Sequence, residues 1–495
     1  MPEERPALHV LFLSAEADPL IKVGGLADVA GSLPQALMRL DPAAFEGRRP
    51  EVRLVLPFHP LVAQRAQDLR PIVEFRLEGF RRDPLVRVLE TRLGDIPVYV
   101  IDGDLMPHEG ELYHEDATAD AEKFIFFSLA ALELPAHLGW PVDIVQANDW
   151  HSAISVYCLP RVKQDDPCLR NAHSLMVVHN LPYMGAGSEK ALASFGIGES
   201  QDAALPDWAR HLPLPMGLSA ADRIVTVSPS YAREILTKEF GCGLETFLRS
   251  RQGKLVGILN GMDTGLWDPS TDNNITARFG VGDLERRMEN KTSLLREFSL
   301  EEDAETPLLA MVSRMDPQKG IDLALEALDQ LRYSDWQAIL LGTGAPDLEE
   351  AARRLEKQTG GRLRAVTRVD PQLSHRLYAG ADILLMPSRY EPCGISQMIA
   401  MRYGCVPVVR STGGLKDTVV DASEGEGTGF TFKRASADAL RIAMRRAFKA
   451  RAEPVLWRGL QSRGMARDFS WRESARSYAR LYTEIIADNT EGAQI

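Results

Sequence analysis

Short apolar runs alternate with amphipathic stretches along most of the chain. The first run spans residues 9–14, and a glycine pair separates it from a stretch in which apolar residues recur at steps of three and four. This spacing is typical of a helix with one buried face. The stripe comprises Leu26, Val29, Ala30, Leu33, Leu37 and Leu40. The pattern therefore predicts a strand, a glycine-containing turn and a helix.

The same alternation continues to about residue 260. The later apolar runs are too short for helices and lack the in-and-out alternation of a half-exposed sheet, so they indicate buried parallel strands. The predicted strands are Val52–Leu56, Val98–Ile101, Ile144–Ala147, Leu175–His179, Ile224–Val227 and Leu255–Leu259.

A polar stretch from about residue 260 to 290 separates this series from a second one. Strands are predicted at Leu308–Val312, Trp336–Leu341, Leu363–Val366, Ile383–Met386 and Val406–Val409, and helices at Gly320–Leu331, Asp347–Gln358, Gly394–Tyr403, Ala435–Lys449 and, closing the chain, Trp471–Ile486. Two successive series predict an α/β protein with two doubly wound, Rossmann-like domains that face each other across a cleft. The predicted boundaries are residues 1–262, 263–470 and, for a terminal helix and tail, 471–495.

Composition narrows the class of protein. The 495 residues are 45% hydrophobic and 25% charged, which is typical of a soluble globular protein. The net charge of −12 and the lack of a Lys/Arg block argue against nucleic-acid binding. Five scattered cysteines favour a reducing compartment over a disulfide framework or zinc site. Without a signal-peptide pattern or a long apolar run, we expect a cytoplasmic protein that does not contact membranes.

Candidate chemistry follows the predicted strands, because open parallel sheets bind ligands beyond the carboxyl ends of their strands. Lys22-Val-Gly-Gly-Leu26 opens the first helix, where glycines let a ligand approach the backbone and helix amides favour an anion. A tight turn with a solvated lysine explains this segment equally well. Asp149 and His179 follow later strands and suit a polyol ligand, although a helix-capping Asp149 and a structural His179 are commoner cases when each is taken alone.

The second half offers cations and further glycines. Arg314 and Lys319 flank a proline-containing turn, so both could reach one diphosphate and stabilise charge on a leaving phosphate; two solvated loop charges are the alternative. Glu391 is the carboxylate best placed to face the cleft. Thr412-Gly413-Gly414 places another glycine pair at a helix start, which fits phosphate oxygens or a purely structural turn. Gly342-x-Gly344 matches a dinucleotide fingerprint only in part, because Asp347 stands at the third glycine.

Taken in order, these segments resemble the family of bacterial glycogen synthases and plant starch synthases, glycosyltransferase family 5. The resemblance runs from Ser14 to about Ile486. It is carried by Lys22–Val29, Asp149-Trp-His151, Val178-His-Asn180, Thr226–Pro229, Asn260-Gly, Ser313-Arg with Gln318-Lys-Gly320, Pro387–Gly394 and Thr412–Leu415. It implies a GT-B fold and retaining transfer of glucose from ADP-glucose to the non-reducing end of an α-1,4-glucan in glycogen biosynthesis. Residues 1–262 would then serve the acceptor side and residues 263–470 would bind the donor, with the terminal helix crossing back to the first domain.

The resemblance also implies roles for individual residues. The catalytic set would be Glu391, His179, Asp149, Arg314 and Lys319; the substrate-binding set would be Lys22, Gly24, Gly25, Asn260, Cys393, Gly394, Thr412, Gly413 and Gly414. Arg314 and Lys319 would hold the diphosphate, while Lys22 and the amides near Gly24 and Gly25 would contact donor phosphate and sugar. No metal or other cofactor is expected, because the two cations can supply the charge. Domain closure over the donor is expected, and a homo-oligomer is left open.

Three positions depart from the family pattern. Asn148 replaces a usual histidine, Met184 replaces a usual glutamine, and Val369 stands where some relatives stack the donor base on an aromatic ring. The preference for ADP over UDP therefore rests on the resemblance alone. One alternative keeps the fold but uses UDP-glucose or a small acceptor. Another is a non-catalytic nucleotide-sugar binding protein, since a fold does not fix a function.

Overall fold

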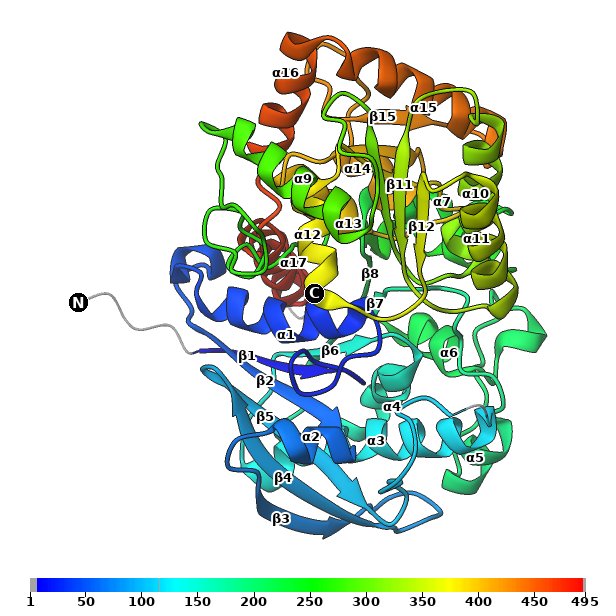
Figure 1. Ribbon diagram of the computed structural model, residues 1–495. Coiled ribbons are helices and arrows are strands. Elements are labelled where there is room, and N and C mark those ends of the chain that lie inside the picture. The colour runs from blue at the N-terminus through cyan, green and yellow to red at the C-terminus, as the bar shows by residue number, and fades with distance from the viewer. Residues whose placement is uncertain (1–6, 115, 493–495) are drawn as a thin grey trace. The chain divides into compact units, whose positions relative to one another are not determined.

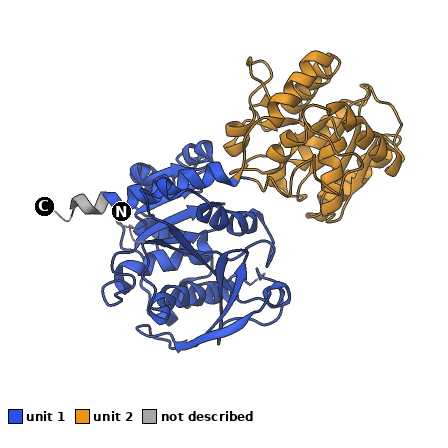
Figure 2. Ribbon diagram, turned by 90° about the vertical axis from the view of Figure 1, so that its left-hand side faces the viewer, with its two compact units in different colours: residues 1–261, 471–495 blue, residues 262–470 orange. Residues whose placement is uncertain are grey.

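The computed structural model describes residues 7–114 and 116–492, which form α/β layers (Figure 1). The chain divides into two compact units (Figure 2). Unit 1 comprises residues up to Gly261 together with those from Trp471 onward, and unit 2 comprises Met262–Ser470. No helix among the described residues is long and apolar enough to cross a membrane.

The sheet of unit 1 has nine strands in the order β3-β4-β5-β2-β1-β6-β7-β8-β9. Seven of them run parallel: β1 (Leu8–Leu13), β2 (Pro50–Pro57), β5 (Ile96–Gly103), β6 (Ile144–Asn148), β7 (His173–Val178), β8 (Arg223–Thr226) and β9 (Leu255–Gly257). The other two, β3 (Arg70–Arg76) and β4 (Leu85–Leu93), form an antiparallel edge.

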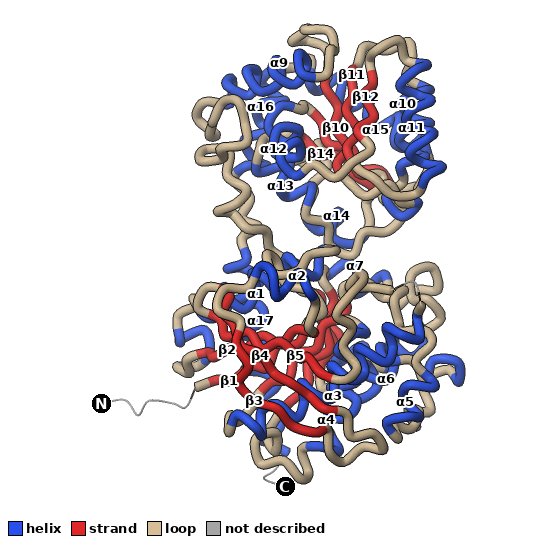
Figure 3. The backbone as a smooth tube through the Cα atoms, turned by 60° about the horizontal axis from the view of Figure 1, so that its bottom comes forward, coloured by secondary structure: helices blue, strands red, loops and turns tan. Residues whose placement is uncertain are grey.

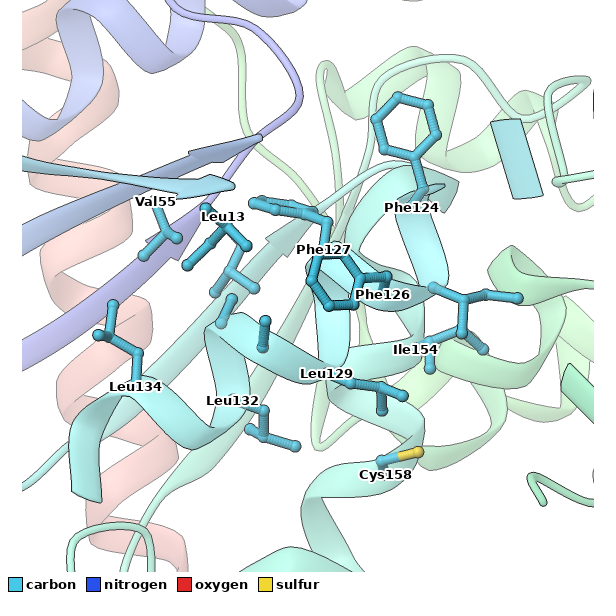
Figure 4. Close-up of a cluster of buried hydrophobic side chains, with 14 of the residues drawn as sticks. Leu13, Val55, Phe124, Phe126, Phe127, Leu129, Leu132, Leu134, Ile154 and Cys158 are labelled. Carbon is cyan, nitrogen blue, oxygen red and sulfur yellow. The ribbon is translucent and has the colours of Figure 1, made fainter. Parts of the chain in front are cut away.

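Helices cover both faces of this sheet. Since successive side chains of β1 point to opposite faces, they pack against different helices. Val10 and Phe12 pack with α1 (Gly25–Met38) and α17 (Trp471–Gly492). Leu11 and Leu13 lie on the other face with α3 (Ala117–Leu138) and α4 (Ala153–Val162), where Figure 4 shows Leu13 near a row of phenylalanines. Shorter helices of the unit are α2 (Pro60–Arg65), α5 (Glu189–Phe195), α6 (Pro213–Ala220), α7 (Pro229–Glu234) and α8 (Glu245–Ser250).

Unit 2 has a parallel six-stranded sheet in the order β12-β11-β10-β13-β14-β15, drawn in red among blue helices in Figure 3. Its strands are β10 (Leu308–Val312), β11 (Gln337–Leu341), β12 (Leu363–Val366), β13 (Ile383–Met386), β14 (Val406–Arg410) and β15 (Phe430–Phe432). One face packs against α10 (Ile321–Gln330), α11 (Pro346–Gln358), α15 (Ala437–Arg451) and α16 (Pro454–Met465). Further α-helices of the unit are α9 (Arg287–Glu297), α12 (Pro371–Gly380), α13 (Ser396–Arg402) and α14 (Gly413–Thr418).

In both sheets, the order in which the chain adds parallel strands reverses once, at a place called the switch point. Counted along the chain, the parallel strands of each unit follow the order 3-2-1-4-5-6, continued by β9 in unit 1. The connections reverse between β1 and β6 in unit 1 and between β10 and β13 in unit 2. The crevice beyond the carboxyl ends of such neighbouring strands is where open α/β sheets bind ligands. The loops after these four strands are therefore the places to look for a site.

The predicted strands and helices are present, with ends shifted by a few residues. The predicted stripe from Leu26 to Leu40 is buried on α1 and in the turn that follows it. One expectation is wrong in detail. Leu255–Leu259 was predicted to be a buried strand, but β9 spans only Leu255–Gly257 at the parallel edge of the sheet, and Val256 is exposed. The β3–β4 hairpin was not predicted, because β3 is mostly exposed and lacks an apolar run.

Candidate functional site

A cavity of about 210 Å³ lies at the switch point of unit 2. The ends of β10 and β13 and the loops that follow them form its wall. The lining includes Ser313, Arg314, Lys319, Ser388, Glu391 and Gly394. Two of the three segments predicted to act in this half of the chain, those of Arg314 and Lys319 and of Glu391, therefore meet in one cavity.

Close backbone packing joins the two loops. Gly320 has φ +70°, and a Cβ there would lie 2.3 Å from the carbonyl oxygen of Pro387, so the approach requires glycine. The Arg389 N–H donates to the carbonyl oxygen of Gln318 (2.7 Å), and Arg389 pairs with Asp322 at 2.7 and 2.8 Å. These contacts fix the segment that carries Lys319 against the segment that carries Glu391.

Lys319 and Glu391 form an ion pair in the cavity wall. The Lys319 ammonium donates to both carboxylate oxygens of Glu391 at 2.8 Å, and the Ser388 hydroxyl donates to Oε2 at 3.0 Å. Glu391 is buried, whereas Lys319 is partly exposed. An ammonium has three N–H donors, so one donor of Lys319 is left for a ligand.

Arg314 supplies the second positive charge. Its side chain is exposed and has no ion pair or hydrogen bond within residues 7–114 and 116–492. Two cations against one carboxylate leave the cavity wall with a charge of +1. A guanidinium presents a fork of donors that matches phosphate oxygens. The cavity therefore has the charge and the donors to hold a phosphate group.

The predicted glycine pair Gly413–Gly414 packs against the same loop. A Cβ at Gly413 or Gly414 would lie 2.0 Å from the carbonyl oxygen of Glu391 or Cys393, respectively. The Gly414 N–H donates to the Glu391 carbonyl oxygen at 3.1 Å. The glycines thus have a structural role here: they let β14 and α14 approach the Glu391 loop. The Gly414 amide, predicted to meet phosphate, already has a backbone partner.

The incomplete Gly342-x-Gly344 fingerprint is also structural. A Cβ at Gly342 would lie 1.8 Å from the Ser313 carbonyl oxygen, and one at Gly344 would lie 2.3 Å from that of Met315. These glycines let the loop after β11 pack on the loop that carries Arg314.

In unit 1, a buried carboxylate organises the predicted glycine turn. Glu16 follows β1, and its Oε2 accepts hydrogen bonds from the N–H groups of Val23 (2.6 Å) and Gly24 (2.7 Å). The Gly24 amide, predicted to contact the donor, is therefore engaged. A Cβ at Gly25 would meet nothing within 4 Å, so packing inside unit 1 does not explain this glycine. Room for a close ligand would explain it.

Lys22 is surrounded by carboxylates. Its ammonium donates to Asp28 at 2.6 Å and to Asp18 at 3.2 Å. Burial alone would lower the pKa of Lys22, but the charges and hydrogen bonds of Asp28 and Asp18 outweigh it and raise the pKa above its ordinary value. Lys22 stays charged, yet Glu16, Asp18 and Asp28 give the turn a net negative charge. The electrostatic case for phosphate is stronger in unit 2.

Asp149 and His179 meet at the carboxyl ends of β6 and β7. Asp149 Oδ1 accepts the N–H of His179 at 2.7 Å, and its side chain does not cap a helix. His179 Nε2 lies 3.0 Å from Asn148 Oδ1. Because Asn148 Nδ2 donates to the Leu13 carbonyl oxygen, Oδ1 faces the histidine, and His179 carries its proton on Nε2. Asn148, which stands where the family usually has a histidine, thus fixes the tautomer of His179.

Burial governs the charges of this cluster. It raises the pKa of Asp149 to about 7, despite hydrogen bonds from His179 and Asn180 that lower it. It lowers the pKa of His179 to about 3. Burial, aided by Lys123 and His179, also lowers the pKa of His151 to about 3. Both imidazoles are neutral at pH 7, and they can exchange hydrogen bonds with hydroxyl groups without carrying charge.

Several buried polar atoms of unit 1 have no partner in the described structure. They are His151 Nδ1, Asn180 Oδ1 and Asn260 Oδ1. Asn260 lies beyond the end of β9 and Asn180 beyond β7, so both follow strands of the parallel series. Buried polar groups are usually hydrogen-bonded. Their open positions suit a ligand rich in hydroxyl groups.

Sequence reasoning missed part of the site. Glu16 lies just beyond the first predicted strand, which ends at residue 14, and an acid at that place is a signal that could have been read. Tyr113, whose hydroxyl donates to Glu16 at 2.6 Å, comes from a loop 97 residues away without any pattern. No group of three or more His, Cys, Asp or Glu side chains could hold a metal ion within the described ranges.

Comparison with protein families gives two matches. Residues 9–250 match the starch synthase catalytic domain, and residues 295–457 match the glycosyl transferases group 1. The first match contains the Glu16 and Asp149 segments, and the second contains the cavity of unit 2.

Individual proteins match over nearly the whole chain. A glycogen synthase of Anaeromyxobacter sp. (strain Fw109-5) is 40% identical over 486 residues, covering 97% of this chain and 100% of its own. Glycogen synthase 1 of Rhizobium meliloti (strain 1021) is 38% identical over 504 residues, with coverage of 97% and 100%. The catalytic domain of starch synthase IV from Arabidopsis thaliana, solved with ADP and acarbose, superposes with a TM-score of 0.87 at 32% identity, covering 97% of this chain and 100% of that one.

Proposed function

This chain belongs to the family of glycogen and starch synthases, and we propose that it transfers glucose from ADP-glucose to the non-reducing end of an α-1,4-glucan with retention of configuration. The observation that carries the proposal is the unit 2 cavity, in which Arg314 and Lys319 meet Glu391 at the switch point. The starch synthase of similar structure was solved bound to ADP and acarbose, which supports a nucleotide-sugar donor and a glucan acceptor here.

In unit 2, the two cations stabilise the leaving group. The bond between the glucosyl C1 and the phosphate oxygen breaks, and its electron pair goes to the diphosphate of ADP. Arg314 and the remaining donor of Lys319 bind that growing negative charge. Gly394 lines the same cavity, and the Gly413–Gly414 pair packs behind it against the carbonyl oxygens of Glu391 and Cys393; we keep Cys393 and Thr412 assigned to the donor.

The acceptor hydroxyl attacks C1 as the glucosyl group passes through an oxocarbenium-like state. A new C1–O4 bond forms, and the hydroxyl proton passes to the departing phosphate oxygen. Glu391 is poorly suited to attack C1, because both of its oxygens accept hydrogen bonds from Lys319. Attack from the face of the leaving group then gives retention without a covalent intermediate.

Unit 1 supplies groups for hydroxyls. Asp149 and neutral His179 can exchange hydrogen bonds with a sugar, and the unpartnered oxygens of Asn180 and Asn260 can accept them from its hydroxyl groups. Lys22 and the Gly24–Gly25 turn remain assigned to the donor. For Gly24 this contact cannot use the N–H, which Glu16 already binds.

The proposed reaction needs no metal, since Arg314 and the remaining donor of Lys319 can stabilise the negative charge on the leaving diphosphate. Removal of metals with EDTA should leave the rate unchanged. Loss of activity that magnesium or manganese restores would contradict this part of the proposal.

We also propose a cytoplasmic location, which cell fractionation tests. Light scattering of the purified chain would decide whether it forms a homo-oligomer.

Product analysis tests the reaction itself. Incubation of maltoheptaose with ADP-glucose should give oligosaccharides that grow one glucose at a time, with new α-1,4 linkages in the anomeric NMR spectrum. A β-linkage would refute retention. Formation of free glucose alone would mean that the donor is hydrolysed and would refute the transfer reaction. A product with a small acceptor only would place the chain in another class of glycosyltransferase.

A further inference from the structure

Glu16 accepts several hydrogen bonds near the switch point of unit 1. It is 3% exposed, and its two oxygens accept three hydrogen bonds of 2.6–2.7 Å, from the N–H groups of Val23 and Gly24 and from the Tyr113 hydroxyl. These partners belong to two different segments. The carboxylate therefore ties the end of β1, the glycine turn and the loop before α3 together.

The loop that carries Tyr113 is itself anchored. The His114 N–H donates to Asp120 on α3 at 3.0 Å, and the buried Lys123 ammonium donates to Asp120 (2.7 Å) and to the Leu112 carbonyl oxygen. Tyr113 is thus presented to Glu16 by a loop fixed on both sides. Its ring lies 5.0 Å from that of His151, between centroids.

The space around the two glycines of the turn is open. A Cβ at Gly24 would have its closest contact at 3.7 Å, with Glu16 itself, and one at Gly25 would contact nothing within 4 Å. At Val23 and Gly24, the hydrogen bonds from the backbone N–H groups to Glu16 are the contacts that hold the turn. Charged hydrogen bonds to buried carboxylates are the strong ones, and Glu16 supplies two of them.

We propose that Glu16 is a positioning residue, which holds the Lys22–Gly25 turn in its donor-binding conformation and, through Tyr113, fixes that turn relative to His151. This role rests on the proposed function for its effect on turnover. Glu16 does not act as a base, because both oxygens already accept hydrogen bonds. It sets where Lys22 and the first amides of α1 lie.

Substitution separates positioning from charge. In Glu16→Gln, the side-chain oxygen can still accept both amide N–H groups, and the NH₂ can donate to Tyr113. Glu16→Ala removes all three bonds. We expect Glu16→Ala to lower kcat on the order of 10²-fold, the size of effect caused by a misplacement of about 1 Å, while Glu16→Gln retains most of the activity.

A second readout does not depend on activity. Hydrogen–deuterium exchange of the peptide containing Val23 and Gly24 should be slow in the wild-type chain and in Glu16→Gln and fast in Glu16→Ala. Asp143 offers a matched control, since it accepts the His9 N–H and pairs with Arg48, both at 2.8 Å, at the opposite ends of β1 and β6. Asp143→Ala should lower thermal stability without changing kcat or exchange in the turn.

The exchange rates and kcat values of these variants decide between positioning and other roles of Glu16. Slow exchange in Glu16→Ala, or wild-type kcat in that variant, would overturn the proposal. Loss of activity in Glu16→Gln with exchange still slow would show that the charge matters and not the position. If Glu16→Ala does not fold, Tyr113→Phe removes one bond and should lower kcat several-fold; an unchanged rate would refute the Tyr113 connection. A wild-type chain that does not transfer glucose would refute the proposed function, while the exchange result would still test Glu16.

Discussion

Removal of Lys319 should separate stability from catalysis in unit 2. In Lys319→Met, the buried Glu391 carboxylate keeps only the Ser388 hydroxyl as a side-chain partner. Breaking a buried ion pair in this way costs about 3–5 kcal/mol. Because Lys319 is partly exposed and the cavity admits water, we expect about 3 kcal/mol, at the lower end.

The double variant Lys319→Met/Glu391→Gln removes the unpaired charge. It should recover about 2 kcal/mol of the lost unfolding free energy, which is a typical coupling energy for contacting residues. Its activity should stay on the order of 10²–10³-fold below wild type, because the charge on the leaving phosphate is not stabilised.

Urea unfolding can be followed by the fluorescence of the buried Trp336 and Trp457 in unit 2, and turnover by release of the nucleotide. Two results would refute the reasoning. One is a Lys319→Met chain as stable as wild type, which would mean that the ion pair is not buried in solution. The other is a double variant that regains activity, which would remove Lys319 from the reaction.

Three further predictions follow from single positions. Arg314→Ala should lower kcat on the order of 10²–10³-fold without a shift in melting temperature, because its exposed side chain has no partner in the described structure; a loss of stability equal to that of Lys319→Met would contradict this. Gly320→Ala should destabilise unit 2 and lower turnover, since a Cβ would meet the Pro387 carbonyl at 2.3 Å, while Gly282→Ala, where nothing lies within 4 Å, serves as a neutral control in thermal unfolding. The buried His179 has a pKa of about 3 in the folded chain and 6.5 as its ordinary value, so below pH 6.5 the unfolded chain binds a proton that the folded chain does not. As the pH falls from 6.5 to about 3, His179 should therefore lower the free energy of unfolding by about 1.4 kcal/mol per pH unit. Urea unfolding of His179→Gln between pH 6.5 and 4.5 should lack that contribution. Asp149, whose pKa burial raises to about 7, has an effect of opposite sign, which is the same in the wild-type and variant chains.

The central strands of both units could be predicted because they are buried on two faces and read as continuous apolar runs. The β10 segment Leu308–Val312 and the β13 segment Ile383–Met386 were predicted with their observed bounds. The residues that line the unit 2 cavity follow those strands directly, so local reading was enough to find Arg314, Lys319 and Glu391.

Contacts between distant segments could not be predicted in the same way. Whether the Gly413–Gly414 pair faces a ligand or the Glu391 loop depends on the distance between two backbones, which the sequence does not carry. Tyr113 reaches Glu16 from a loop with no periodic pattern. Asp149 fits a helix cap by sequence, and only the pairing of β6 with β7 places its carboxylate against the His179 N–H instead.

The most direct test of the proposed function is release of nucleotide from ADP-glucose and from UDP-glucose, each with and without glycogen. The proposal predicts rapid, glycogen-dependent release of ADP and little release of UDP. A preference for UDP-glucose would contradict the proposed donor while leaving the unit 2 cavity as a diphosphate site. No release from either donor, together with tight binding of ADP, would contradict the proposed transfer reaction itself.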